Sequence, residues 1–321
     1  MINAEIIADS KNTITEERIT TFIVRFPRIV LAELNTHRNF SRNSASSRAI
    51  PFDKMLDQVI EDPFVPIRFH RDHKGMQGSA YLTGEEHQLA TNRWLSSRDK
   101  VVEQATLLNK NLNVTKQLCN RLLEPYMWHT AIITATEWEN FFALRAHPAA
   151  EIHIAKLAEK MLEAYNRSIP KNLCPGQWHI PFAEKMYRWR LLDLVKVDAD
   201  GDKMFTPDIE QSLKVKIATA RCARVSYLNF EGKDDYEADI KLHDSLAKMG
   251  HWSPFEHCAR TMNSDEYYPY AHVEGLRDAD RIEGWSGNLK GFVQYRKMFK
   301  HESKKRFKNY CQIGCSLKSV N

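Results

Sequence analysis

The chain has 321 residues, of which 43% are hydrophobic and 27% are charged, a composition typical of globular proteins that bury a substantial core. Its net charge of +5 is too small to indicate a nucleic-acid-binding protein. The six cysteines are scattered without a Cys-x-x-Cys pair, and we find neither a signal peptide nor a long apolar run. We therefore expect a cytoplasmic protein with free thiols, no membrane span and no metal site.

The first part of the chain is expected to begin with two strands. Residues 3–8 alternate weakly in polarity, and residues 19–26 are rich in β-branched and aromatic side chains. Pro27 is suited to open a helix over residues 29–34, because proline is tolerated in the first turn of a helix. A polar loop follows at residues 36–48, and residues 52–60 indicate a short helix.

The polar loop is rich in hydrogen-bond donors. It contains three arginines, one histidine, four serines and two asparagines within residues 36–48, and no acid. Arginine forks and serine hydroxyls bind phosphate oxygens well, so this composition indicates a site for a phosphate or another anion. The alternative is a solvated polar loop without a ligand.

The rest of the chain is expected to be mostly helical. Residues 63–84 form a long irregular connection, and the capping-box pattern Thr83-Gly-Glu-Glu86 predicts a helix that runs to about residue 111. Residues 126–134 fit either a strand or a buried helix, and the acidic residues 195–207 are the best candidate junction. Gly250 fits a helix C-cap. Further helices are expected at residues 114–123, 137–145, 149–165, 209–220 and 236–249.

Two irregular regions complete this description. Residues 174–182 are expected to be a loop, and residues 284–297 to be turn-rich at first and then helical. The basic run from Lys297 to Lys308 is expected to be a solvated tail rather than a DNA contact.

The polar loop resembles the signature Arg-His-Arg-x-x-Ser-x-Asn-Glu-x-Ser-x-Arg of the flavin-dependent thymidylate synthases. Six of the eight fixed positions agree, while Thr36 replaces the first arginine and Ser44 replaces the glutamate. Further blocks resemble the same family and bring the resemblance to roughly half of the chain: Arg121-Leu-Leu-Glu-Pro125, Asn140-Phe-Phe-Ala-Leu-Arg145, Ala220-Arg-Cys-Ala-Arg-Val-Ser226 and His251-Trp-Ser-Pro-Phe-Glu-His257.

The order of these blocks differs from that of the family. The last two blocks precede the polar loop in the usual family chain and follow it here, so the resemblance implies a circularly permuted form. It also implies an α/β (α+β) fold, a mixed twisted sheet with helices in a single domain over residues 1–321. Residues 63–111 have no recognised counterpart and are expected to be an insertion, and residues 264–321 a C-terminal extension. The family assembles as homotetramers whose sites lie where subunits meet.

The resemblance implies a function as well. It implies an FAD-dependent thymidylate synthase, which transfers a one-carbon unit from methylene-tetrahydrofolate to C5 of the nucleotide dUMP with NADPH as reductant. A second interpretation is a hydroxymethylase acting on dUMP or dCMP with the same folate donor. A third is a non-catalytic nucleotide-binding or nucleic-acid-binding relative that has lost its flavin.

Site residues follow from the matched positions. Arg145 would lie at the pyrimidine ring and His251 near the flavin and folate; a helix salt bridge and a histidine satisfied after a helix are the alternatives. Nucleotide contacts would come from Glu33, Ser44, Ala45, Ser46, Ser47, Arg48 and Arg121. Flavin contacts would come from Thr36, His37, Arg38, Thr134, Thr136, Asn140, Ser226 and Ser253.

Some matched positions depart from the family pattern. Thr134 and Thr136 replace an asparagine and an arginine beside the flavin, and Glu33 stands where the family usually has a glutamine. A carboxylate can accept a hydrogen bond from the exocyclic amine of cytosine, which uracil lacks, so the base and the product stay open.

Overall fold

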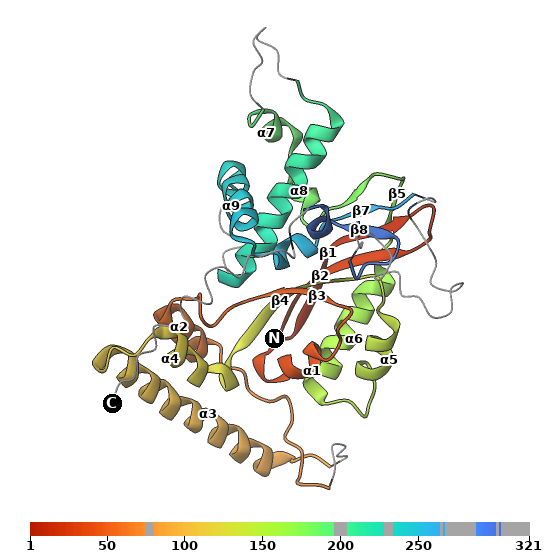
Figure 1. Cartoon of the computed structure of the whole chain (residues 1–321). Helices are drawn as coiled ribbons and strands as arrows, with labels where there is room; N and C mark the ends of the chain where they lie inside the picture. The colour runs from red at the N-terminus through yellow and green to blue at the C-terminus, as the bar shows by residue number, and fades with distance from the viewer. Residues whose placement is uncertain are drawn as a thin grey trace, which may run out of the picture.

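The computed structural model describes residues 1–74, 80–195, 204–227, 234–263, 266, 287–299 and 302. A five-stranded sheet with the order β3-β4-β2-β1-β5 forms its centre (Figure 1). Neighbouring strands are antiparallel except β1 and β5, which are parallel. The strands are β1 (Asn3–Asn12), β2 (Arg18–Pro27), β3 (Ser41–Ser44), β4 (Trp128–Ala135) and β5 (Lys171–Leu173).

Both faces of the sheet are buried, because β2 and β4 carry apolar side chains on both sides. Phe22, Val24 and Phe26 point to one face, where α6 (Ile152–Arg167) packs against β1 and β2 and α5 (Glu139–Arg145) packs against α6. Ile23 and Ile132 point to the other face. Successive side chains of a strand point to opposite faces, so a run of consecutive apolar residues places apolar side chains on both faces.

The second face is covered by α8 (Pro207–Arg224), through Cys222 and the following Val225. Next to it lies α9 (Tyr236–Met249), which ends at Gly250 in the left-handed conformation. Arg221 and Arg224 both bond the carboxylate of Asp239, which is fully buried, so this ion cluster fixes α9 against α8. Figure 1 shows α5 and α6 on one side of the sheet and α8 and α9 on the other, so the sheet is the middle layer of three.

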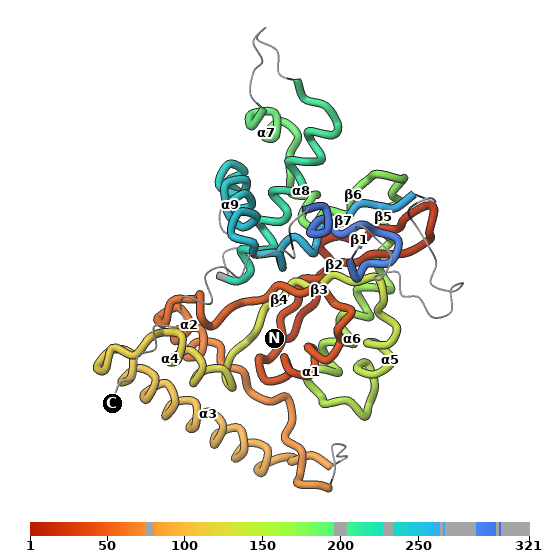
Figure 2. The backbone as a smooth tube through the Cα atoms, viewed as in Figure 1, coloured from red at the N-terminus to blue at the C-terminus, as the bar shows by residue number. Residues whose placement is uncertain are grey.

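A second apolar cluster lies beside the end of the sheet where β4 begins. It joins Phe52, Met55 and Val59 of α2 (Phe52–Glu61) to Ala105 of α3 (Gly84–Thr106). The π-turn η2 (Leu107–Asn111) continues α3, and α4 (Lys116–Leu122) packs on both. Figure 2 shows α3 running along the outside of this region.

A smaller three-stranded sheet lies near β1 and β5. Its antiparallel strands are β6 (Trp178–His179), β7 (Ala259–Thr261) and β8 (Phe292–Gln294), in that order. Short helices complete the described chain: η1 (Arg28–Val30), α1 (Leu31–Asn35), η3 (Glu124–Tyr126), η4 (Ala183–Lys185), α7 (Arg188–Leu192), η5 (Val225–Tyr227), η6 (Ser253–Glu256) and η9 (Tyr295–Met298).

Most predicted elements are confirmed, with shifted ends, and residues 126–134 form a strand because β4 pairs with both β2 and β3. Three predictions were wrong. Residues 36–48 contain the strand β3, residues 174–182 contain β6, and residues 292–294 form β8 before a 3-10 turn. Each of these strands is short and exists through pairing with a distant partner, which local sequence does not reveal.

Three further predictions concern the cap of α3, the junction and the C-terminal tail, and the absence of a membrane span. Helix α3 begins where predicted, but the Thr83 side chain makes no capping hydrogen bond. Residues 196–203 of the expected junction and residues 303–321 of the tail lie outside the described residues. In the part of the chain that the structure describes, every helix is too short or too polar to cross a membrane.

Candidate functional site

A cavity of about 460 Å³ opens beside β3 and the start of α1. We call it the arginine cavity, because four of its lining residues are arginines and only one is an acid. Six predicted nucleotide-binding residues line it together. The lining is Arg28, Leu31, Arg42, Asn43, Ser44, Ala45, Ser46, Ser47, Arg48, Arg121 and Glu124.

The serine-rich wall of this cavity is anchored from three sides. The backbone N–H of Ala45 donates to the carbonyl of Thr130 on β4 (2.9 Å), and that of Ser46 donates to the carbonyl of Ser226 after α8 (3.1 Å). The buried Asn120 amide on α4 donates to the carbonyl of Ser47 (2.7 Å). Anchored backbone of this kind presents its remaining polar groups in fixed positions, which suits anion binding.

Two of the four arginines are held by the protein itself. Arg28 lies 3.2 Å from both the Glu124 carboxylate and the Nδ1 atom of His129. Burial, followed by the charge of Arg28, lowers the pKa of His129 to about 3, so this ring is neutral and accepts the hydrogen bond. Arg42 donates to the backbone carbonyl of Leu34 (3.1 Å).

The other two arginines are exposed and available. Arg48 and Arg121 make no ion pair within the described ranges. A ligand in the arginine cavity would therefore meet two anchored and two unpaired guanidinium groups, opposed by the single carboxylate of Glu124. This charge balance is that of an anion site.

A second cluster joins the start of the polar loop to α5. The Nε atom of Arg145 donates to Nε2 of His37 (3.0 Å), and its Nη2 atom donates to the hydroxyl of Thr36 (3.2 Å). Burial, and then the charges of Arg145 and Arg42, lower the pKa of His37, so its ring stays neutral and accepts. The structure thus brings together three predicted site residues, but Arg145 does not line the arginine cavity.

The two late sequence blocks lie against β3. The hydroxyl of Ser253 donates to the side-chain oxygen of Asn43 (3.2 Å) across 210 residues of sequence. The side-chain amide of Asn43 donates to the carbonyl of Cys222 (2.5 Å). Ser226 and Ser253 are therefore adjacent to the polar loop in space, and their predicted flavin contacts stay predictions.

Two predicted flavin residues are buried and already bonded. The hydroxyl of Thr134 bonds the hydroxyl of Thr21 (2.7 Å) and Nδ1 of His257 (2.8 Å), and Thr134 is fully buried. The hydroxyl of Thr136 accepts from the backbone N–H of Lys290 (3.1 Å). A flavin contact at Thr134 would require this network to open, so that contact stays a prediction.

Four further predicted residues have no side-chain hydrogen bond to the described part of the chain. Arg38, Asn140 and His251 are exposed. Glu33 does not line the arginine cavity, and its Oε2 atom is buried without a hydrogen-bond partner among the described residues. A buried carboxylate oxygen without a donor is costly, so a hydrogen-bond donor at Glu33 Oε2 would stabilise the protein.

Sequence reasoning missed Arg28 and Arg42 as lining residues. Arg42 shares a strand face with Ser44, so the period of two would have found it if β3 had been recognised. The sequence around Arg28 does not indicate that it lines the cavity, because its position there depends on the hydrogen bond from its backbone N–H to the distant carbonyl of Met127 (2.9 Å).

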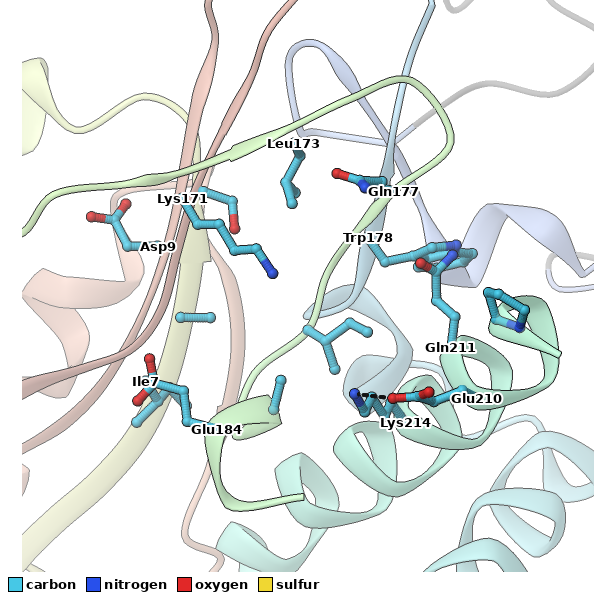
Figure 3. A pocket seen from close by; sticks show the side chains of 15 residues that line it. Ile7, Asp9, Lys171, Leu173, Gln177, Trp178, Glu184, Glu210, Gln211 and Lys214 are labelled. Atoms are coloured by element: carbon cyan, nitrogen blue, oxygen red, sulfur yellow. Dashed lines mark hydrogen bonds and ion pairs between the residues drawn. The ribbon is translucent and has the colours of Figure 1, made fainter. Parts of the chain in front are cut away.

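A second cavity, also of about 460 Å³, lies between the β1–β5 edge and α8. Two lysines and three acids line it, so we call it the mixed cavity: Lys171, Lys214, Asp9, Glu184 and Glu210. Figure 3 shows Lys171 reaching from the strand edge toward its interior and Lys214 paired with Glu210 (2.7 Å). It contains none of the predicted site residues.

Comparisons with known proteins identify the family of this chain. The family described as "Thymidylate synthase complementing protein" matches residues 2–171, just over half of the chain. None of the curated proteins matches the chain.

Two solved structures are similar to parts of the chain. The UMP/dUMP methylase PolB from Streptomyces cacaoi, bound with 5-Br UMP, is 17% identical with a TM-score of 0.44 over 52% of this chain and 89% of that chain. Thymidylate Synthase X from Helicobacter pylori, with FAD and dUMP, is 17% identical with a TM-score of 0.32 over 46% of this chain and 67% of that chain.

The family match includes the polar loop, Arg121 and the block that ends at Arg145, which are the residues that build the arginine cavity and the Arg145 cluster. The chain therefore belongs to the thymidylate synthase complementing protein family, the family of the flavin-dependent thymidylate synthases.

Proposed function

We propose that this chain is a flavin-dependent enzyme that modifies a pyrimidine nucleoside monophosphate whose phosphate binds in the arginine cavity. The observation that carries the proposal is the lining of that cavity by four arginines and the serine-rich loop, with one acid that already pairs with Arg28. A hydrogen bond to a charged group contributes about 1.5–3 kcal/mol, so Arg48 and Arg121 together offer a large share of a nucleotide's binding energy.

The residues around the Arg145 cluster fit FAD in their chemistry. Thr36, His37 and Arg38 offer hydroxyl, imidazole and guanidinium groups next to the polar loop, and Asn140 adds an exposed amide on α5. When bound, FAD would supply the hydride-transfer chemistry that the protein side chains lack. The protein would orient the reactants, and the Arg145 guanidinium would stabilise negative charge that develops on the pyrimidine ring.

The reaction proposed is transfer of a one-carbon unit from methylene-tetrahydrofolate to C5 of dUMP, with NADPH as reductant. The second candidate is hydroxymethylation of dUMP or dCMP. The unpartnered Oε2 atom of Glu33 favours cytosine, since that oxygen can accept from an exocyclic amine and uracil has none. Family membership supports both reactions equally.

We also propose a homotetramer with shared sites and a circularly permuted order of the family's blocks. Arg38, Asn140 and His251 are exposed in the single chain, and Arg145 lies outside the arginine cavity, so one chain does not enclose a complete site. The contact of Ser253 with Asn43 supports the permuted order, since two blocks that are far apart in this sequence lie side by side in the structure.

The deciding experiment measures the flavin absorbance of the protein, the mass of the oligomer and the chemical identity of the product. The purified protein is expected to show a flavin absorbance band and the mass of a tetramer in light scattering. Incubation with methylene-tetrahydrofolate, NADPH and either dUMP or dCMP, followed by mass spectrometry, distinguishes a methylated from a hydroxymethylated product. A colourless protein that binds dUMP but not added FAD would instead support the non-catalytic relative.

A further inference from the structure

Residues 287–299, which lie outside the segment matched to the family, contact three separate blocks of the candidate site. At the centre of these contacts is Gln294 on β8, which is 2% exposed. Its Nε2 atom lies 3.0 Å from the hydroxyl of Ser41 on β3 and 3.2 Å from the carbonyl of Glu256 on η6. It also lies 3.0 Å from the side-chain oxygen of Asn288.

These groups form a closed hydrogen-bond network. The hydroxyl of Ser41 donates to Oδ1 of Asn288 (3.2 Å), and the amide of Asn288 donates to the carbonyl of Asn39 (2.8 Å). An amide nitrogen has two hydrogens, so Gln294 can satisfy the Glu256 carbonyl with one and share the other between Ser41 and Asn288. Asn39 of the polar loop is thereby bonded to Asn288, and Ser41 at the start of β3 is bonded to both Asn288 and Gln294 of β8.

The same segment also contacts the entrance to α5. The Nζ atom of Lys290 lies 2.5 Å from the carboxylate of Glu137, and its backbone N–H donates to Thr136. Gly287 fits this arrangement, since its φ is +103° and a side-chain carbon there would lie 2.8 Å from Oε1 of Gln294. The turn before β8 is thus shaped to admit the Gln294 side chain.

Strand β3 needs this support because it is an edge strand. Its backbone pairs with β4 on one side only, and the five-stranded sheet ends there. Hydrogen bonds of its own side chains add to this pairing: Ser41 bonds Gln294, and Asn43 bonds the Ser253 hydroxyl and the Cys222 carbonyl. The next residue, Ser44, lines the arginine cavity.

We propose that Gln294 is a positioning residue that sets β3, and with it the cavity residues Arg42 and Ser44, relative to the His251–His257 block. This inference rests on the proposed function, because it assigns the positioned strand to the nucleotide site. Gln294 acts through Ser41 and the Glu256 carbonyl and does not itself line the arginine cavity.

The test compares Gln294→Met with Asn12→Ala. Methionine preserves the volume of glutamine and removes both donors. Asn12 is the control, since it is a fully buried amide that donates to the carbonyls of Gly291 (2.8 Å) and Met262 (2.9 Å), and among the described residues its side chain bonds no block of the candidate site. Both variants should lower Tm, and only Gln294→Met should weaken dUMP binding in calorimetry, by about tenfold, and speed amide exchange at residues 41–44.

Equal dUMP affinity in Gln294→Met and the wild type, or an equal loss in Asn12→Ala, would overturn the proposal. If the wild type binds no dUMP, the proposed function fails instead, and amide exchange at residues 41–44 still decides whether Gln294 holds β3. Ser41→Ala removes the acceptor on β3 and should reproduce the faster exchange if Gln294→Met fails to fold. Unchanged exchange in Ser41→Ala would count against the proposal.

Discussion

The arginine cavity and the mixed cavity have the same volume, about 460 Å³, and opposite charge. Four arginines face one acid in the first, whereas two lysines face three acids in the second. In the mixed cavity Lys214 pairs with Glu210 (2.7 Å) and Asp9 pairs with Arg18 (2.6 Å). A phosphate there would meet carboxylates that outnumber the lysines.

The two cavities therefore differ in charge rather than in volume: guanidinium groups are in excess in the arginine cavity, and carboxylates are in excess in the mixed cavity. The walls of the two cavities also differ in construction. The arginine cavity is built on a loop whose backbone is fixed by bonds to Thr130, Ser226 and Asn120, so its donors have set positions. Lys171 extends from the edge of the sheet on a flexible stem (Figure 3), which offers a charge without a fixed direction.

The largest expected effect belongs to Arg145, which lies outside both cavities. Arg145→Ala is expected to lower kcat by about 10²–10³-fold, or 2.7–4 kcal/mol, because a positioned cation that stabilises transition-state charge is lost. The fold and flavin content should persist. Steady-state kinetics with dUMP and the flavin absorbance band measure the two effects, and near-wild-type kcat would remove Arg145 from the chemistry.

The second prediction compares the contribution of each cavity to dUMP affinity. Arg121→Ala removes an exposed, unpaired guanidinium from the arginine cavity, and dUMP affinity should fall by about 1.5–3 kcal/mol. Lys171→Ala removes one cation from the mixed cavity and should leave the affinity unchanged. Calorimetry on both variants gives the comparison, and a larger loss in Lys171→Ala would reverse the assignment of the sites.

The sequence predicted the fold class and most of the elements, and it also predicted residues that the structure gathers around one cavity. Six of the seven predicted nucleotide residues line that cavity, since a donor-rich run keeps its chemistry whatever its backbone conformation. The strand β3 was missed because Ser41-Arg-Asn-Ser44 has no β-branched or aromatic residue, and it forms by pairing with Ile132 and Ile133 of β4.

Residues whose role depends on distant contacts could not be predicted. Arg28 is placed by the bond of its backbone N–H to the carbonyl of Met127, and Gln294 reaches Ser41 across 253 residues of sequence. Thr134 was predicted to bind flavin from its matched position, but burial between Thr21 and His257 cannot be read from one sequence. Long-range hydrogen bonds, rather than local propensity, decide these three positions.

A third prediction concerns the hydrogen-bonded chain that connects Ser10 of the mixed cavity, through His179, Thr21 and Thr134, to His257 near β3. Burial lowers the pKa of both histidines to about 3 from 6.5, so both are neutral in the folded protein. The unfolded chain binds more protons below pH 6.5, so the stability that these neutral rings contribute is present above pH 6.5 and is lost as pH falls toward 3.

Each such histidine should add up to about 1.4 kcal/mol per pH unit to the decline in the free energy of unfolding between pH 6 and pH 5. His179→Gln removes one titrating ring and should reduce that slope by a comparable amount. Urea unfolding at pH 7, 6 and 5 measures it. An unchanged slope in His179→Gln would mean that the ring is not held neutral in the folded protein.

The smallest expected effect concerns Glu33, whose buried Oε2 atom has no hydrogen-bond partner among the described residues. If a cytosine amine is its missing donor, Glu33→Gln should shift the preference from dCMP toward dUMP by about 1 kcal/mol, or roughly fivefold, the size of one hydrogen bond. If a second subunit supplies the donor instead, the variant should weaken the oligomer and leave the ratio of affinities unchanged. Calorimetry with dUMP and dCMP, with light scattering on the same samples, separates the two outcomes. An unchanged ratio and an unchanged mass would together show that Glu33 neither reads the base nor binds a neighbouring chain, and the cytosine candidate would lose its structural support.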